Sequence, residues 1–264
     1  MQKTALPPEV MEKRLAWAKH ELRLKKLARW YFRHVLWFDL CNSILPRSEA
    51  KAKEQALARK GNRGWMSDLS AEYSRNLRGN QTATKQKSWD TERVWWAPML
   101  VRGKLHIEVL PQNFPGETPE GVAIIVRKIP AVLNARFPQA SKPKVLMTDR
   151  GRGFFQPCNG LITDEYLAAL QETGLRAHQG DDASVQPGNL QDVVLHETAV
   201  SWVRHLLERT LPKRPWEETC AAYGSRLREV CGTVNANHDV EGLCLEFPER
   251  LQAVVDKLGD RLRT

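Results

Sequence analysis

Two short apolar runs in this sequence each end close to an aspartate. The first runs from Val35 to Phe38 and is followed at once by Asp39. The second runs from Val145 to Met147, and Asp149 lies two positions further on. Runs of this length and composition predict buried central strands. An Asp after a strand is also a common turn residue, so neither acid by itself identifies a site.

Other apolar patterns predict the rest of a sheet. The segments 95–100 and 104–110 have strand character, and Gly103 between them suggests a hairpin turn. A short strand is expected near 175–178. The order is therefore strand, hairpin, helix, strand, helix, strand, which is typical of a mixed α/β sheet covered by helices.

Helical spacing of apolar residues predicts the covering helices. Thr118 and Pro119 open one helix, with a kink at Pro130, and Thr163 caps another that ends at Gly174. The remaining predicted helical stretches are 1–34, 49–60, 215–234 and 248–262.

A longer helix is expected after the loop at 180–188. Asn189 would cap it, and it would run to about Arg209. Asp192, His196 and Glu197 would then lie in its first turns. An acid in this position can simply complement the helix dipole, so this interpretation stays open for Asp192.

These patterns divide the chain into three predicted parts. Residues 1–34 form a basic helical segment, residues 35–210 a mixed α/β domain, and residues 211–264 a helical extension. Within the domain, 41–93 is rich in Lys and Arg and has little apolar periodicity outside its one helix. We interpret it as a basic insertion, which could contact a phosphate backbone or be a solvated loop.

Charge and cysteine content narrow the function classes. The 264 residues carry a formal net charge of +9, with a pI near 9.4. Such a surplus favours a polyanionic partner, most often nucleic acid, over a basic protein without one. Five cysteines without a CxxC pair suggest free thiols in an intracellular, reducing compartment. No run approaches the ~20 apolar residues of a membrane span, so no membrane partner is expected.

Acids at two strand ends and on a following helix suggest a two-metal site. Two divalent ions about 3.5–4 Å apart need clustered oxygen ligands and act on phosphodiesters. Asp39 and Asp149 are the first two candidate ligands. Asp192 is the third, with Glu197 as the alternative.

Several stretches carry a resemblance to a known family. RLAWAKHEL at 14–22, HVLWFD at 34–39, KVLMTDRG at 144–151, ASVQPGNLQD at 183–192 and FPERLQAVVDKLG at 247–259 resemble motifs of the mariner superfamily of DDE/DDD transposases. The sequence departs from the family at Leu40, where an acid is usual, and at Arg150, where Asn is usual. The family's S-P-D-L segment is replaced by residues 185–188. No counterpart of its N-terminal helix-turn-helix pair is expected, which is the pattern expected of a truncated or diverged copy.

The resemblance implies an RNase H-like fold and DNA cleavage and strand transfer with two Mg²⁺ (or Mn²⁺) ions. It identifies Asp39, Asp149 and Asp192 as catalytic metal ligands, with Glu197 as the alternative third acid. It implies DNA as partner, a nuclear location and no small-molecule cofactor, and it allows a homodimer. From position alone, Arg150 and Arg152 are expected near the scissile phosphate. A catalytically inactive DNA-binding relic and an RNase H-like structure-directed nuclease are the alternatives.

Overall fold

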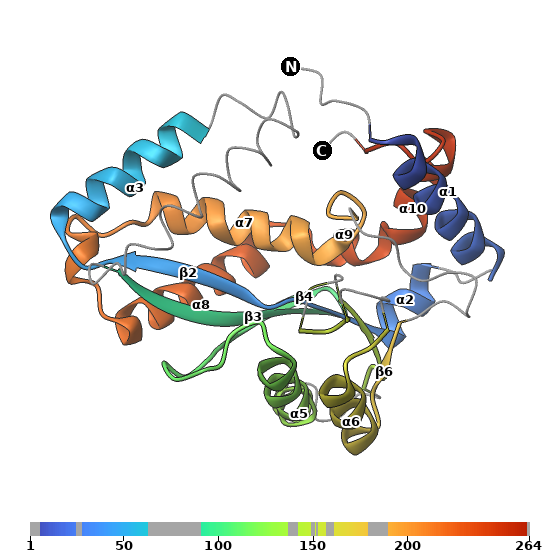
Figure 1. Cartoon of the computed structure of the whole chain (residues 1–264), viewed down its shortest axis with the longest axis horizontal. Coiled ribbons are helices and arrows are strands. Elements are labelled where there is room, and N and C mark those ends of the chain that lie inside the picture. Colours follow the sequence, from blue (N-terminus) through green and yellow to red (C-terminus); the bar gives the residue numbers. More distant parts are fainter. Residues whose placement is uncertain are drawn as a thin grey trace.

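The computed structural model describes residues 6–24, 28–62, 91–136, 142–148, 151, 153–156, 161–178 and 190–262. Within these residues, six strands form one mixed sheet in the order β2-β3-β1-β5-β6, with β4 on the other edge of β3 (Figure 1). The strands are β1 (Val35–Phe38), β2 (Cys41–Pro46), β3 (Thr91–Val101), β4 (Lys104–Val109), β5 (Val145–Met147) and β6 (Arg176–Ala177).

The pairings of β1 place the two predicted strand ends side by side. β1 runs antiparallel to β3 and parallel to β5, with Trp37 opposite Met147. The β3–β4 hairpin is confirmed, and its turn residues Arg102 and Gly103 both have positive φ, as the tightest hairpin turns require.

β1 and β2 are two halves of one interrupted strand. They keep a single register with β3, because Phe38 lies opposite Met99 and Cys41 opposite Trp96. At the interruption the Asp39 N–H donates to the Pro98 carbonyl at 3.3 Å. Pro98 has no N–H to donate in return. The missing ladder bond accounts for the break at Asp39.

Helices cover both faces of the sheet (Figure 1). Side chains of Leu36, Phe38 and Leu146 pack with α5 and α6 on one face, whereas Trp37 and Met147 pack with the C-terminal helices on the other. The helices are α1 (Pro8–Arg23), α2 (Ala28–His34), α3 (Glu49–Asn62), α5 (Pro119–Arg136), α6 (Asp164–Thr173), α7 (Leu195–Arg209), α8 (Cys220–Asn237), α9 (Val240–Leu245) and α10 (Phe247–Asp256), with a 3₁₀ turn, η1 (Pro215–Glu217).

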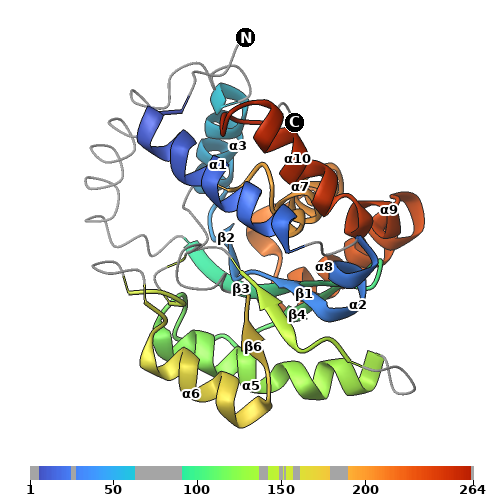
Figure 2. The same ribbon diagram turned by 90° about the vertical axis from the view of Figure 1, so that its right-hand side faces the viewer.

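The N-terminal and C-terminal helices share a core with the sheet. α1 lies beside α10 (Figure 2), and Phe247 of α10 contacts three aromatic rings. Its ring centroid is 4.7 Å from those of Tyr31 and Trp37 and 6.2 Å from that of Trp17. The described helices of these two segments, α1, α2 and α8–α10, therefore cover the same sheet face as α7.

Several local predictions are confirmed, and three need correction. Thr118 caps α5, accepting from the Gly121 N–H at 3.1 Å, and α6 ends at Gly174, whose φ is 67°. Thr163 does not cap α6 with its side chain, because its hydroxyl donates to the Gly153 carbonyl at 3.0 Å.

The second correction concerns the long helix. α7 begins at Leu195, after Val194 as the N-cap residue, so Asp192 lies in the turn before the helix. Asn189 lies outside the described residues. The third concerns the insertion: residues 41–46 and 91–93 are strand residues, held in the sheet by the β2–β3 pairing. Among the described helices, none has the length and apolar character to cross a membrane.

Candidate metal centre

The first acid, Asp39, faces the side of the sheet covered by α7. Side chains alternate along a strand, so Asp39 continues the series of Val35 and Trp37. One carboxylate oxygen, Oδ1, accepts from the Leu40 N–H at 2.7 Å, and Oδ2 accepts from the Cys41 thiol at 3.4 Å. These contacts fix the carboxylate at the strand interruption, where it is half-buried.

The first turn of α7 brings two further ligand-type side chains to Asp39. His196 is completely buried, and Glu197 is half-buried. One carboxylate oxygen of Asp39, one of Glu197 and one ring nitrogen of His196 lie within 4.8 Å of one another. Sheet and helix thus gather residues that are far apart in the sequence into one cluster.

The electrostatics of this cluster are those of crowded acids. Burial first, and then the charge of Asp39, raise the pKa of Glu197, while Arg204 partly opposes the rise. Burial and the neighbouring Asp39 also raise the pKa of the Cys41 thiol, so Cys41 stays a neutral hydrogen-bond donor. Two carboxylates this close repel each other unless a cation lies between them.

The donor set fits a divalent cation. Ligands around one ion with bonds of about 2.0–2.2 Å lie at most about 4.4 Å apart, and the three donor atoms here lie within 4.8 Å of one another, so a small movement would suffice to bind one ion. Carboxylate oxygens are ligands for Mg²⁺ and Mn²⁺, and imidazole nitrogen is a ligand for transition metals. Asp39, His196 and Glu197 could therefore hold one ion.

Asp192, the predicted third acid, is engaged elsewhere. Its two carboxylate oxygens each accept from Arg14, whose guanidinium nitrogens lie 2.8 Å away, and Oδ2 also accepts from the Leu262 N–H at 2.6 Å. The Arg14 side chain is completely buried and also donates from Nε to the Gly259 carbonyl at 2.8 Å. Asp192 thus connects α1 to the C-terminal tail, and the cluster with Asp39 contains Glu197 instead.

The other predicted site residues, Asp149, Arg150 and Arg152, lie outside the described residues. The strand that leads to Asp149 is described. β5 lies parallel to β1, and its last residue, Met147, is opposite Trp37.

Sequence reasoning missed two residues of this site. The sequence places His196 in the first turns of a helix and gives it no role there. Its position next to Glu197, the alternative third acid, was a signal for a metal ligand. Arg204, an exposed residue two turns further along α7, has a guanidinium nitrogen 3.9 Å from Cys41 Sγ. Arg204 lies seven residues after Glu197, which places both side chains on one face of the helix. This spacing was the signal that could have predicted Arg204 near the acids.

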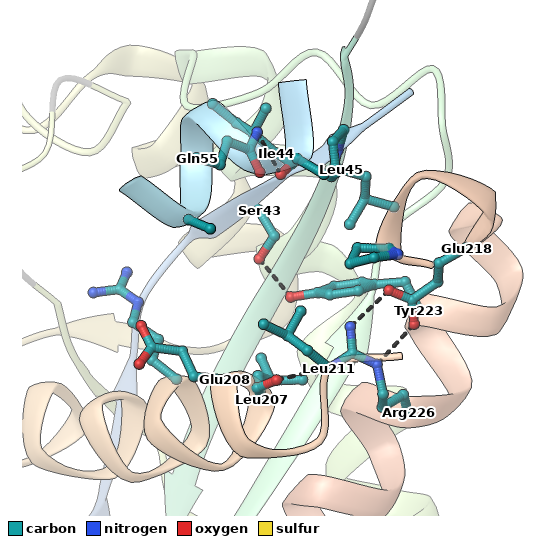
Figure 3. Close-up of a pocket in the computed structure, with 15 residues that line it drawn as sticks. Ser43, Ile44, Leu45, Gln55, Leu207, Glu208, Leu211, Glu218, Tyr223 and Arg226 are labelled. Carbon is teal, nitrogen blue, oxygen red and sulfur yellow. Dashed lines mark hydrogen bonds and ion pairs between the residues drawn. The ribbon is translucent and has the colours of Figure 1, made fainter. Parts of the chain in front are cut away.

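A separate cavity of about 270 Å³, which none of the three cluster residues lines, has Arg204 in its lining (Figure 3). Ser43 accepts from the Tyr223 hydroxyl at 2.7 Å, and Arg226 forms a two-bonded ion pair with Glu218 at 2.6 and 2.7 Å. The first bond joins β2 to α8, and the ion pair lies within the α8 side of the cavity. Arg204 is the residue that the cavity shares with the surroundings of the acid cluster.

Comparison with known proteins identifies the architecture. No family model and no curated protein matches the sequence. The crystal structure of the catalytic domain of Mos1 mariner transposase matches it with a TM-score of 0.60, 9% identity and complete coverage of both chains. The fold is RNase H-like. The Mos1 mariner paired end complex with Mn gives a TM-score of 0.61 at 10% identity, covering 98% of this chain and 65% of that one. The Mos1 strand transfer complex gives 0.57 at 12% identity, covering 98% and 64%.

Proposed function

We propose that this chain is a metal-dependent phosphoryl transferase of the transposase type, which cleaves DNA strands and joins them to a target. The single observation that carries the proposal is the meeting of Asp39 with Glu197 and His196 at the strand interruption of an RNase H-like sheet. The net charge of +9 supports a polyanionic substrate. The similar structures include complexes described with transposon ends and with Mn or Mg.

Asp39, Asp149 and Glu197 are the proposed metal-binding acids. Glu197 replaces Asp192 in this role, because both Asp192 oxygens already accept from Arg14. For Asp149 the support is its sequence position: it lies two residues beyond Met147, as Asp39 lies two residues beyond Trp37, and these strands are parallel neighbours. Two divalent ions, Mg²⁺ or Mn²⁺, are proposed.

Bound divalent ions would supply an activated nucleophile and stabilise the departing oxygen. The chain's own residues would position the reactants. Asp39 and Glu197 would remain ionised and fixed, the first by its contacts with Leu40 and Cys41. In hydrolysis a water oxygen bonds to phosphorus as the bond to the 3′ oxygen breaks. The water loses a proton to solvent, and the 3′ oxygen gains one. In strand transfer the oxygen of that 3′-hydroxyl bonds to a phosphorus of the target strand as the target's bond from phosphorus to its 3′ oxygen breaks. The attacking hydroxyl loses its proton, and the departing 3′ oxygen gains one.

Arg204 is the proposed cation for the scissile phosphate among the described residues. It is exposed and next to Cys41, and its charge lowers the pKa of Glu197, so it acts electrostatically on the acid cluster. Guanidinium groups bind phosphate oxygens with paired hydrogen bonds. Arg150 and Arg152 remain proposed phosphate contacts from their sequence position, and a homodimer and a nuclear location remain predictions.

A plasmid assay tests this function. The full chain is incubated with supercoiled plasmid and a duplex oligonucleotide ending in a 3′-hydroxyl, with Mn²⁺, with Mg²⁺ or with EDTA. We expect metal-dependent nicking and joining of the oligonucleotide to the plasmid. Asp39→Asn and Glu197→Gln should abolish both reactions, whereas His205→Gln, an exposed change on the same helix, should leave them intact.

The same assay separates the alternatives. Nicking that persists in Asp39→Asn would reject the proposed site. Nicking without joining would point to the structure-directed nuclease. DNA binding without any metal-dependent nicking would point to the inactive relic.

A further inference from the structure

A nitrogen ligand lies inside the proposed acid site. His196 immediately precedes Glu197 in the first turn of α7, and its side chain is completely buried. Its ring nitrogen lies within 4.8 Å of carboxylate oxygens of both Asp39 and Glu197. The cluster that the fold assembles is therefore two carboxylates with one imidazole.

This donor set differs chemically from carboxylates alone. Mg²⁺ prefers oxygen ligands and keeps several waters, because it loses its hydration shell reluctantly. Imidazole nitrogen favours first-row transition ions, whose affinities for nitrogen-containing sites rise from Mn²⁺ through Co²⁺ and Ni²⁺. Replacing one oxygen by one nitrogen thus lowers the relative affinity for Mg²⁺.

We propose that His196 is a direct nitrogen ligand of the metal centre and biases it toward first-row transition ions, such as Co²⁺ and Mn²⁺, over Mg²⁺. The inference rests on the proposed function, since it uses the same Asp39 and Glu197. It also explains why a polar ring occupies a fully buried position in the turn that carries Glu197. A histidine that only packs in the core would leave metal selectivity unchanged.

Spectroscopy of the unaltered chain tests the ligand directly. Mn²⁺ is added to protein carrying ¹⁵N only in histidine, and to unlabelled protein. Electron spin-echo modulation of the bound ion then reports nitrogen nuclei bonded to it. We expect modulation from a directly bound nitrogen, which changes from the ¹⁴N to the ¹⁵N pattern on labelling. This measurement needs no substitution at a buried residue.

Metal titration calorimetry tests selectivity. His196→Gln should weaken Co²⁺ binding at least about tenfold, the lower end of the losses seen when a metal site's supporting groups are removed. Mg²⁺ affinity should change much less. His205→Gln, on the exposed side of α7, is the matched control and should alter neither affinity.

The outcomes separate this inference from the proposed function. Bound Mn²⁺ that depends on Glu197 but shows no histidine nitrogen would overturn the role of His196 and leave the metal centre in place. A Co²⁺ to Mg²⁺ affinity ratio equal in His196→Gln and the parent would also overturn it. Absence of any bound divalent ion would overturn both proposals.

Discussion

Two acids five residues apart, on either side of the start of α7, have opposite surroundings. Asp192 receives two hydrogen bonds from the buried Arg14 guanidinium and one from a backbone N–H. Glu197 lies against another acid, Asp39, and its pKa is raised by burial and by that charge. The first carboxylate is neutralised by the protein itself. The second is compensated only in part, by Arg204, and its crowding against Asp39 is typical of sites completed by a bound cation.

The comparison shows how local charge balance assigns roles to residues of the same chemical type. Arg14 joins α1, the turn before α7 and the C-terminal tail through Asp192 and the Gly259 carbonyl. Removing either partner leaves a buried group without its partner, so this contact should matter for stability. Asp39 and Glu197 weaken the metal-free fold through their repulsion, so they should matter for ion binding instead.

The largest expected effect is on stability at Asp192. Asp192→Asn should lower the free energy of unfolding by about 3–5 kcal/mol, because it removes the carboxylate charge that is paired with the buried Arg14 guanidinium. Urea unfolding followed by tryptophan fluorescence measures this. Glu172→Gln, which breaks the exposed Arg127–Glu172 pair, is the control and should have little effect. If Asp192→Asn were as stable as the parent, the claim that Asp192 stabilises the fold through Arg14 would be wrong.

The next effect is on activity at Glu197. Glu197→Gln should reduce metal-dependent nicking by at least about a hundredfold, since it replaces an ionised ligand with a neutral amide. Its unfolding free energy in EDTA should not fall, because the repulsion from Asp39 is relieved. Plasmid nicking per folded molecule is the measurement. Asp192→Asn should nick plasmid as fast as the parent at a temperature where the variant remains folded. If it lost as much nicking activity as Glu197→Gln, the structural role that we assign to Asp192 would be wrong.

Metal-induced stabilisation sharpens the contrast in one experiment. A ligand that binds only the folded state at 100 times its Kd adds about 2.7 kcal/mol of stability. Saturating Co²⁺ should therefore raise the unfolding temperatures of the parent and of Asp192→Asn by the same free-energy increment. Glu197→Gln should gain far less. An increment absent from Asp192→Asn and present in Glu197→Gln would reverse our assignment of the third acid.

The sequence was sufficient to predict five of the six described strands and to name Asp39 as a candidate ligand, because short apolar runs and their polar ends are local signals. The RNase H-like sheet also followed from element order together with the family resemblance. The choice between Asp192 and Glu197 could not be made locally. It depends on Arg14, 178 residues away, and on the start of α7 at Leu195, three residues after Asp192. The inclusion of residues 41–46 in the sheet likewise depends on pairing with β3, which is not visible in the residues 41–46 themselves.

The smallest expected effect is the pH dependence of stability that Glu197 contributes. Its pKa in the folded chain is raised above the ordinary 4.5, so the folded state holds this proton more tightly than the unfolded state. Its contribution to stability is therefore fully present below pH 4.5 and is lost as pH rises through the raised folded pKa. Glu197→Gln lacks this loss, so in EDTA its stability relative to the parent should increase between about pH 4 and 7. Urea unfolding across that range measures the difference, and a stability difference independent of pH would show that burial and the charge of Asp39 do not raise the pKa of Glu197 in the metal-free protein.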